Sequence, residues 1–193
     1  NGGHCSVVDC VASGNTQSGL IGRGVFSRCT VHGNGSNGIH AYDDSVVSEC
    51  VANNNTTFGI LARLSQIINC SASENGVAGF NLYFYGRISR CHAHDNGIGS
   101  TSDQAAGFML DGRFSRVEDC TASSNLFGFR TAAFNADSNF FARNTASFNT
   151  TNWSIAAGNV CLVVLAANAA AITGDTGGTS PGSTNPNANY TID

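Results

Sequence analysis

The segment Ile67-Ile68-Asn69-Cys70-Ser71-Ala72-Ser73-Glu74-Asn75, followed by Gly79-Phe80, is one copy of a phrase that recurs along the chain. Six copies carry Cys at the same place, at steps of 19, 21, 20, 21 and 29 residues: Cys10, Cys29, Cys50, Cys70, Cys91 and Cys120. A seventh copy, at 141–149, has Asn144 in place of Cys. A repeat of about 20 residues is typical of a solenoid, in which each copy forms one coil that stacks on the next.

The repeated phrase also predicts the secondary structure. Cys70 and Ala72 are separated by one residue, as are Ile39 and Ala41, and this period of two indicates strands rather than helices. Gly and Asn between the short apolar runs indicate turns. We therefore predict an all-β chain that forms a single-stranded parallel β-helix of about seven coils over residues 1–149, with a C-terminal capping segment over residues 150–193. In that segment, residues 160–165 predict a strand and 166–172 a short helix or another strand.

Two columns of identical residues follow from stacking the copies. Asn recurs five residues after each Cys position: Asn15, Asn34, Asn55, Asn75, Asn96, Asn125 and Asn149. We expect these side chains to hydrogen-bond from coil to coil as an amide ladder, and their backbone to adopt the left-handed conformation that Asn tolerates. The six Cys predict a column of buried thiols that pack as small apolar groups. Disulfides are the alternative interpretation, above all between Cys5 and Cys10.

Two further columns are expected on the outside. The residues just before the Cys positions alternate in charge, with a neutral Asn69 in the middle: Asp9, Arg28, Glu49, Arg90, Asp119 and Arg143. They predict a ladder of exposed ion pairs that fixes the register between coils. A second outward column reads Arg23, Tyr42, Arg63, Tyr83 and then Asp111. Its Arg and Tyr suit either cation–π stacking within the column or a flat face on which sugar rings lie.

One coil is longer than the others, because ten residues, 97–106, lie between Asn96 and Gly107 where earlier copies have three. Insertions of this kind often lie on the binding face of a solenoid. The candidate catalytic residues near it are His94, Asp103 and Asp111. His92 and His94 share one face of a strand and could bind a metal ion with Asp103, but surface His residues on turns usually have no such role. We therefore expect no metal site and no cofactor.

The phrase "(I/V)xxCxAxxN…G(I/F)" over residues 6–149 resembles the right-handed parallel β-helix family, which includes pectate lyases, polygalacturonases and phage tailspikes. The tail looks similar to uncharacterised bacterial β-helix repeat proteins. The resemblance implies the right-handed fold. For members that cleave acidic polysaccharides it implies either calcium-binding carboxylates with an Arg base, or clustered Asp residues that act as general acid and base. This chain has 13 acidic residues, thinly spread, and offers no matching set.

The composition argues against some classes of binding partner. The net charge of −4 argues against nucleic acid and anionic membrane surfaces as partners. No apolar run approaches the roughly 20 residues that cross a bilayer. With no N-terminal cap expected, the leading hypothesis is an extracellular or cell-surface structural module that is not an enzyme. Its partner would be a second copy, stacked end to end into a fibre or adhesive stalk. The alternative is carbohydrate binding or polysaccharide cleavage, implied by the family.

Overall fold

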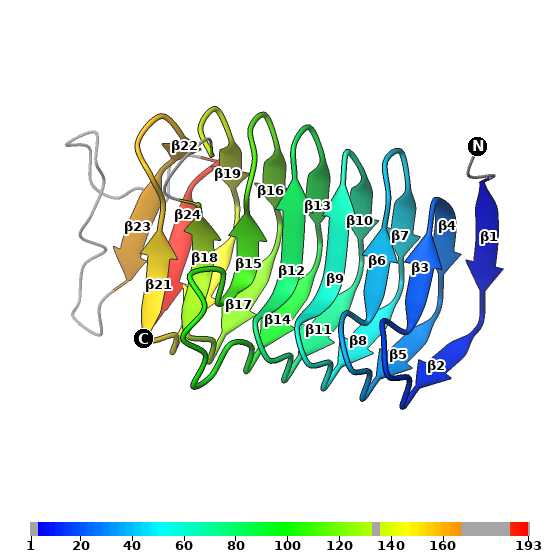
Figure 1. Cartoon of the computed structure of the whole chain (residues 1–193). Coiled ribbons are helices and arrows are strands. Elements are labelled where there is room, and N and C mark those ends of the chain that lie inside the picture. The colour runs from blue at the N-terminus through cyan, green and yellow to red at the C-terminus, as the bar shows by residue number, and fades with distance from the viewer. Residues whose placement is uncertain (1–3, 133–135, 167–185, 193) are drawn as a thin grey trace.

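The structure, a computed structural model, describes residues 4–132, 136–166 and 186–192. Within these ranges the chain consists of short strands joined by turns, with no helix, and it forms a right-handed parallel β-helix of about seven coils. A membrane-spanning helix is therefore absent from the described part of the chain. The predicted fold class is confirmed, and Figure 1 shows the coils stacked along one axis.

Three parallel sheets run along that axis, and each coil contributes one strand to each of them (Figure 1). The first sheet contains β1 (Cys5–Val8), β4 (Gly24–Ser27), β7 (Val46–Ser48), β10 (Gln66–Ile68), β13 (Arg87–Ser89), β16 (Arg116–Glu118), β19 (Phe140–Ala142) and β22 (Val160–Cys161). The second contains β2 (Val11–Ser13), β5 (Thr30–His32), β8 (Val51–Asn53), β11 (Ser71–Ser73), β14 (His92–His94), β17 (Thr121–Ser123), β20 (Thr145–Ser147), β24 (Asn189–Ile192) and β23 (Val163–Ala166). The third contains β3 (Leu20–Gly22), β6 (Ile39–Ala41), β9 (Phe58–Arg63), β12 (Ala78–Tyr83), β15 (Ala106–Leu110), β18 (Phe127–Thr131) and β21 (Thr151–Ser154).

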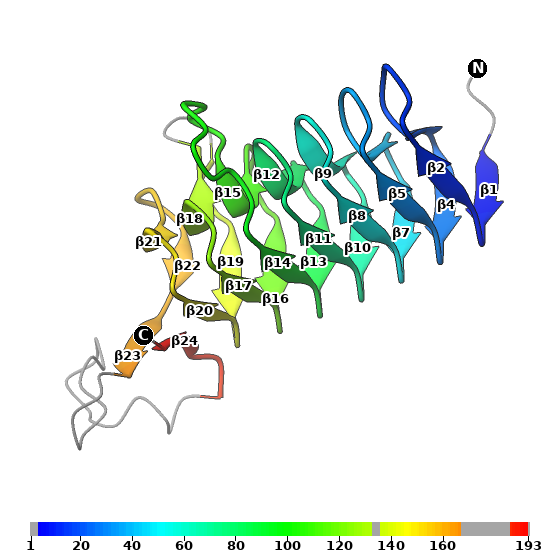
Figure 2. The ribbon, with the colours of Figure 1, turned by 90° about the horizontal axis from the view of Figure 1, so that it is seen from below.

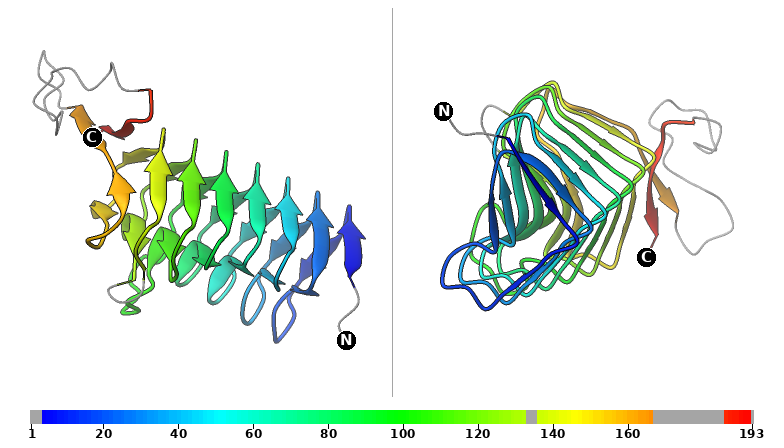
Figure 3. Two further views of the ribbon diagram at one scale, coloured as in Figure 1. Left: turned by 90° about the horizontal axis from the view of Figure 1, so that it is seen from above. Right: turned by 90° about the vertical axis from the view of Figure 1, so that its right-hand side faces the viewer.

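The register places equivalent residues of successive coils directly opposite one another. Ile67 pairs with Val47 on one side and with Ile88 on the other. The end-on view in Figure 3 shows the three sheets as the sides of a roughly triangular coil. One face of every strand therefore points into the interior and the other points outward.

The interior is filled by columns of apolar residues that stack from coil to coil. Along the third sheet, the rings of Phe80, Phe108 and Phe129 stack at 4.9 Å between centroids with interplanar angles of 6°. Trp153 continues the stack at 4.5 Å from Phe129. Rings at this spacing are removed from water and contact each other directly, so the column stabilises the packing of each coil on the next.

The Asn ladder is present, but its backbone differs from the prediction. Asn75 donates its side-chain amide to Oδ1 of Asn96 at 2.9 Å, and Asn96 donates in the same way to Asn125. None of the seven ladder residues has a positive φ; that conformation falls on the residue before each of them, for example Glu74 at 55° and Asp95 at 53°. The expected left-handed Asn was therefore wrong. An extended Asn directs its amide along the axis, and the turn is made one residue earlier.

The predicted Cys column lies in the interior, and all eight Cys of the chain are free thiols. Cys29 to Cys120 are buried, whereas Cys10 in the first coil is half-buried. Each buried thiol accepts a backbone N–H from the preceding coil, as Cys70 does from Cys50 at 3.4 Å. Asn144 takes over this role in the seventh copy and accepts the N–H of Cys120 at 2.9 Å. The disulfide between Cys5 and Cys10 is not formed.

At the C-terminal end, β24 pairs with both β20 and β23 and extends the second sheet (Figure 2). Asn189 enters the interior there, where its Oδ1 accepts the side-chain amide of Asn144 at 2.8 Å. The expected strand at 160–165 corresponds to β22 and β23. Most of the predicted helix or strand at 166–172 lies outside the described residues, as does the rest of the segment to residue 185.

Candidate functional site

A groove of about 710 Å³ lies on the outer face of the third sheet, at the ends of β6, β9 and β12. The column predicted from the sequence lines it, because Tyr83 pairs directly with Arg63 and the residues after β3 and β6 take the equivalent places. Its walls are formed by Arg23, His40, Tyr42, Asp43, Leu61, Ala62, Arg63, Tyr83 and Phe84. The structure thus brings all four members of the possible ligand face, Arg23, Tyr42, Arg63 and Tyr83, into one concave site.

The arginines of the groove are paired with carboxylates rather than with tyrosine rings. Arg23 forms an ion pair with Asp44, and Nε of Arg63 lies 3.4 Å from Oδ1 of Asp43. Asp43 and Asp44 belong to a turn in which Asp44 has a φ of 58°, so both reach the column. In the described residues the two cation–π contacts lie elsewhere, at Phe140 and Phe127, and the predicted Arg–Tyr stacking is not seen. The tyrosine rings of the groove are therefore not covered by any arginine of the described residues.

His40 lines the floor of the groove beside Tyr42. The two rings lie 4.6 Å apart at their centroids, with an interplanar angle of 53°. Burial lowers the pKa of His40 below its ordinary value, because desolvation disfavours the imidazolium. The imidazole is therefore neutral at neutral pH, and it offers one N–H donor and one ring-nitrogen acceptor.

Asp111 lies at the end of the same column and is held by neutral donors. Its Oδ2 accepts the side-chain amide of Gln104 at 2.5 Å and that of Asn81 at 3.0 Å. Burial is the largest cause that raises the pKa of Asp111 above its ordinary value. The pKa of Tyr83 is raised too, first by burial and then by the negative charge of Asp111. A carboxyl group that is desolvated in this way beside a groove is suited to proton transfer.

The insertion at 97–106 folds back over the outer face of the third sheet and brings Gln104 to Asp111. Nε2 of Gln104 also lies 3.5 Å from the hydroxyl of Tyr83. Beneath this segment, Met109 is buried although it points away from the interior, and it packs with Ala78 and Ala106 in a small apolar cluster. Gln104 therefore links the insertion to Asp111 and to Tyr83, which lines the groove.

The other predicted candidates lie apart from this site. His94 is on β14 in the second sheet, where its ring bonds the hydroxyl of Ser123 at 3.1 Å and the carboxylate of Asp95 at 3.0 Å. Asp103 lies in the insertion, and its charge acts on Asp111. Asp103 precedes Gln104, which bonds Asp111, whereas His94 lies on a different sheet from Asp111. No group of three or more His, Cys, Asp and Glu with metal-binding geometry occurs in the described ranges.

The charged column beside the Cys residues forms pairs rather than a continuous ladder. Arg28 contacts Asp9 at 2.7 Å, Arg143 contacts Asp119 at 2.7 Å, and Arg90 donates to Asn69 at 2.7 Å. Its members all have positive φ, from 51° to 57°, so they form the turn between the first and second sheets. This column lies away from the groove and has a structural explanation.

Two residues of the groove region were not among the predicted candidates. Asn81 and Gln104 hold Asp111, and neither belongs to the repeated phrase. Asn81 could have been found from the register between coils, because it is a polar residue that pairs with Leu61 on one side and Met109 on the other, on the outer face of the third sheet. The contact of Gln104 depends on how the insertion folds, for which the sequence has no second copy.

No protein-family model matches the sequence, and no curated protein matches it. Among solved structures, the chain is similar to the pectate lyase Pel9A, with a TM-score of 0.65, 21% identity, and coverage of 78% of this chain and 45% of that one. It is also similar to the A-module of the Azotobacter vinelandii mannuronan C-5 epimerase AlgE4, with a TM-score of 0.63, 17% identity, and coverage of 81% and 57%. The chain thus spans about half the length of each. These similarities establish the β-helix fold and give no support to the predicted fibre.

Proposed function

We propose that the groove on the third sheet binds a polysaccharide chain. The observation that carries this proposal is the row Tyr42, Arg63 and Tyr83, which successive coils place side by side along one concave surface. Tyr rings offer an apolar face and a hydroxyl, a combination that suits sugar rings. The planar guanidinium of Arg63 can donate to the hydroxyl or carboxylate groups of a sugar.

The structural neighbours support this class of ligand. One is named for pectate and the other for mannuronan, and both names denote uronate polysaccharides. At 17–21% identity the likeness shows the fold alone, so the argument rests on the groove of this chain. An extracellular or cell-surface location belongs to the same proposal, because polysaccharide chains would reach the groove there.

Cleavage of the bound chain is the second candidate function, and Asp111 favours it. Its pKa is raised by burial, so a larger fraction of the carboxyl stays protonated than for an exposed Asp. In hydrolysis, a carboxylic acid of this kind can donate its proton to the leaving glycosidic oxygen, while a water molecule attacks the anomeric carbon and passes its own proton to solvent. Gln104 lies within 3.5 Å of both Asp111 and the Tyr83 hydroxyl, which places the acid next to the ring that would hold a sugar.

Binding is tested by isothermal titration calorimetry with oligogalacturonate, oligomannuronate and a neutral dextran oligomer. We expect Tyr83→Ala to weaken binding by about tenfold, as the loss of one stacking ring implies. Tyr85→Ala is the matched control, because Tyr85 is an exposed Tyr that stacks on Phe114 outside the groove. Two results would contradict the proposal. One is a loss of affinity that is equal in Tyr83→Ala and Tyr85→Ala, and the other is no saturable binding of any of these sugars to the wild type.

Cleavage is tested on the same samples by following the release of reducing ends. We expect Asp111→Asn to abolish that release while the affinity for the sugar stays within a few fold of the wild type. Bound sugar that is never cleaved by the wild type would leave binding as the function and remove the second candidate. Cleavage that persists undiminished in Asp111→Asn would remove Asp111 from the reaction.

A further inference from the structure

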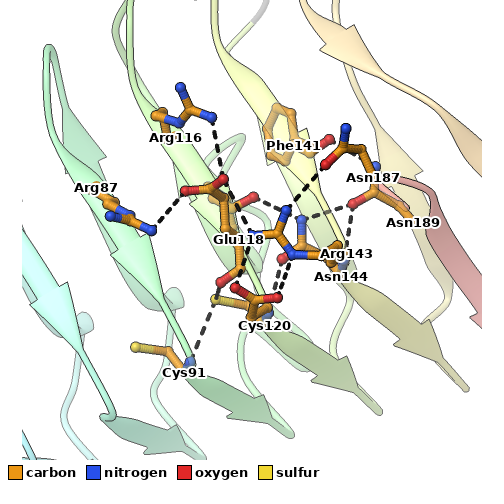
Figure 4. Close-up of polar contacts among 12 residues, drawn as sticks. Arg87, Cys91, Arg116, Glu118, Cys120, Phe141, Arg143, Asn144, Asn187 and Asn189 are labelled. Carbon is orange, nitrogen blue, oxygen red and sulfur yellow. Dashed lines mark hydrogen bonds and ion pairs between the residues drawn. The ribbon is translucent and has the colours of Figure 1, made fainter. Parts of the chain in front are cut away.

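Three arginines converge on one buried carboxylate on the outer face of the first sheet (Figure 4). Glu118, the last residue of β16, is 5% exposed. Its carboxylate lies 3.0 Å from Arg87, 3.2 Å from Arg116 and 3.4 Å from Arg143. The arginines come from three successive coils, so the stacking of the coils assembles the cluster.

The cluster holds more positive than negative charge, because its arginines outnumber its two carboxylates, those of Glu118 and Asp119. Arg143 already binds Asp119 with both Nε and Nη2, at 2.7 and 3.0 Å. Glu118 would be neutralised by one guanidinium, and yet both Arg87 and Arg116 remain beside it. The guanidiniums of Arg87, Arg116 and Arg143 therefore face two carboxylates, those of Glu118 and Asp119. This surplus of positive charge occurs on a chain whose net charge is −4.

Arg87 and Arg116 lie directly opposite each other on neighbouring parallel strands. Like charges in this position repel one another, and Glu118 offsets this repulsion with a single negative charge for two guanidiniums. Their side chains are 50% and 55% exposed, and within the described residues the only ion-pairing partner of each is Glu118. A guanidinium has five N–H donors in a fixed plane. Most donors of both groups are therefore left for a ligand from solvent.

The orientation of the pair is fixed from two sides. Glu118 holds Arg87 through one carboxylate oxygen and Arg116 through the other. The guanidinium of Arg116 also stacks on the ring of Phe140, at 4.6 Å from its centroid. Two guanidiniums that are held in place lose less conformational entropy when they bind an anion.

We propose that Arg87 and Arg116, positioned by the buried Glu118, form a binding site for an oxyanion, a carboxylate or sulfate group. Planar guanidiniums recognise such groups through paired hydrogen bonds. The site lies on a different sheet from the groove and does not depend on the function proposed for it. A free oxyanion and an acid group on a sugar chain share this chemistry.

The test follows the Arg Nε–Hε signals of the protein by NMR while inorganic sulfate is added at constant ionic strength. We expect the signals of Arg87 and Arg116 to shift saturably, and those of Arg28 not to. Arg87→Gln and Arg116→Gln should each weaken sulfate binding by about tenfold. Arg28→Gln removes the same charge from an exposed pair with Asp9 and should leave binding unchanged. No saturable shift, or an equal loss in Arg28→Gln, would overturn the proposal.

Two further variants separate orientation from charge. Arg87→Lys keeps the charge but loses the planar guanidinium, so sulfate binding should still weaken. Arg87→Lys also takes the place of Arg87→Gln in the test if circular dichroism shows Arg87→Gln to be unfolded. Glu118→Gln makes the cluster more positive. If Glu118 positions the arginines, sulfate binding weakens in this variant, whereas tighter binding would overturn its positioning role.

Oligogalacturonate and its methyl ester identify the source of the anion. Shifts of the same signals with the acid but not with the ester assign the site to a carboxylate on a sugar chain. Shifts with inorganic sulfate alone assign it to free oxyanions. Tyr83→Ala should leave the sulfate shifts unchanged, so failure of the groove and failure of this site are distinguishable.

Discussion

Asn75 and Asn96 are joined by a hydrogen bond of 2.9 Å between their side-chain amides, although 21 residues separate them in sequence. The Nδ2 of Asn75 also donates to the carbonyl of Ala52 at 2.9 Å, and its Oδ1 accepts from the backbone and the side chain of Asn55, both at 3.0 Å. One amide thus links three coils. Because the residue is buried, its loss would remove the side-chain acceptor of the Asn55 backbone N–H and a side-chain donor to the Ala52 carbonyl, where water does not replace them.

We expect Asn75→Ala to lower the free energy of unfolding by about 3 kcal/mol, because it leaves several buried donors and acceptors unpaired. Chemical denaturation followed by circular dichroism measures this change. Asn69→Ala is the control, since the side chain of Asn69 is exposed and hydrogen-bonds the guanidinium of Arg90, and Ala at its φ of 53° adds a backbone strain of about 1 kcal/mol that sets the baseline. A loss for Asn75→Ala no greater than that for Asn69→Ala would show that the ladder does not stabilise the fold.

The thiols should differ in reactivity along the column. Burial raises the pKa of Cys91 well above its ordinary value, so its reactive thiolate is scarce at pH 8. Cys5 and Cys10 in the first coil are half-buried and should be alkylated first. Mass spectrometry of the native protein after short exposure to iodoacetamide checks the order. Labelling of Cys91 as fast as Cys10 would contradict the burial of the column.

Asp111 should make stability fall as the pH rises. Its pKa is raised in the folded state, so the folded protein holds the proton more tightly than the unfolded chain. The stability that this proton provides is complete below the ordinary Asp pKa of about 4 and is lost as the pH rises through the folded value. Relative to Asp111→Asn, the wild type should therefore lose stability between acidic and neutral pH in urea denaturation.

Asp119 should show the opposite sign and serves as the control. The hydrogen bond from Arg143 lowers its pKa, so its contribution is present above the unfolded pKa and is lost as the pH falls through the folded value. Relative to Asp119→Asn, the wild type should lose stability on acidification. The same trend with pH for both variants would contradict the two assigned environments.

Met109 gives a test of the insertion. It is buried on the outer face of β15, where it packs with Ala78 and with Ala106 at the end of the insertion. Met109→Ala should cost about 2 kcal/mol of stability, as a buried truncation does. The matched control is Leu61→Ala, because Leu61 occupies an equivalent outward position on β9 and is only half-buried. A smaller loss for Met109 than for Leu61 would show that the insertion does not cover the sheet.

The fold could be predicted from the sequence because stacking converts a repeat into columns. Residues such as Asn75 and Cys70 meet their equivalents in the next coil, so one observed period determines many contacts at once. The column Arg23, Tyr42, Arg63 and Tyr83 was predictable for the same reason.

The contacts that complete the groove could not be predicted in this way. Asp43 pairs with Arg63 and Asp44 pairs with Arg23, because the two carboxylates belong to a turn with a positive φ at Asp44. Gln104 reaches Asp111 from the insertion, which occurs in one coil only. The left-handed residues were placed one position too late, because the repeated Asn marks the residue that bonds along the axis and not the one that turns.

The most direct test of the polysaccharide-binding groove is a crystal structure of the protein with oligogalacturonate bound. We predict sugar density along the third sheet, with a ring against Tyr83 and a polar group of the sugar within hydrogen-bond distance of Arg63. Density confined to another face, or an empty groove at saturating oligosaccharide, would contradict the account.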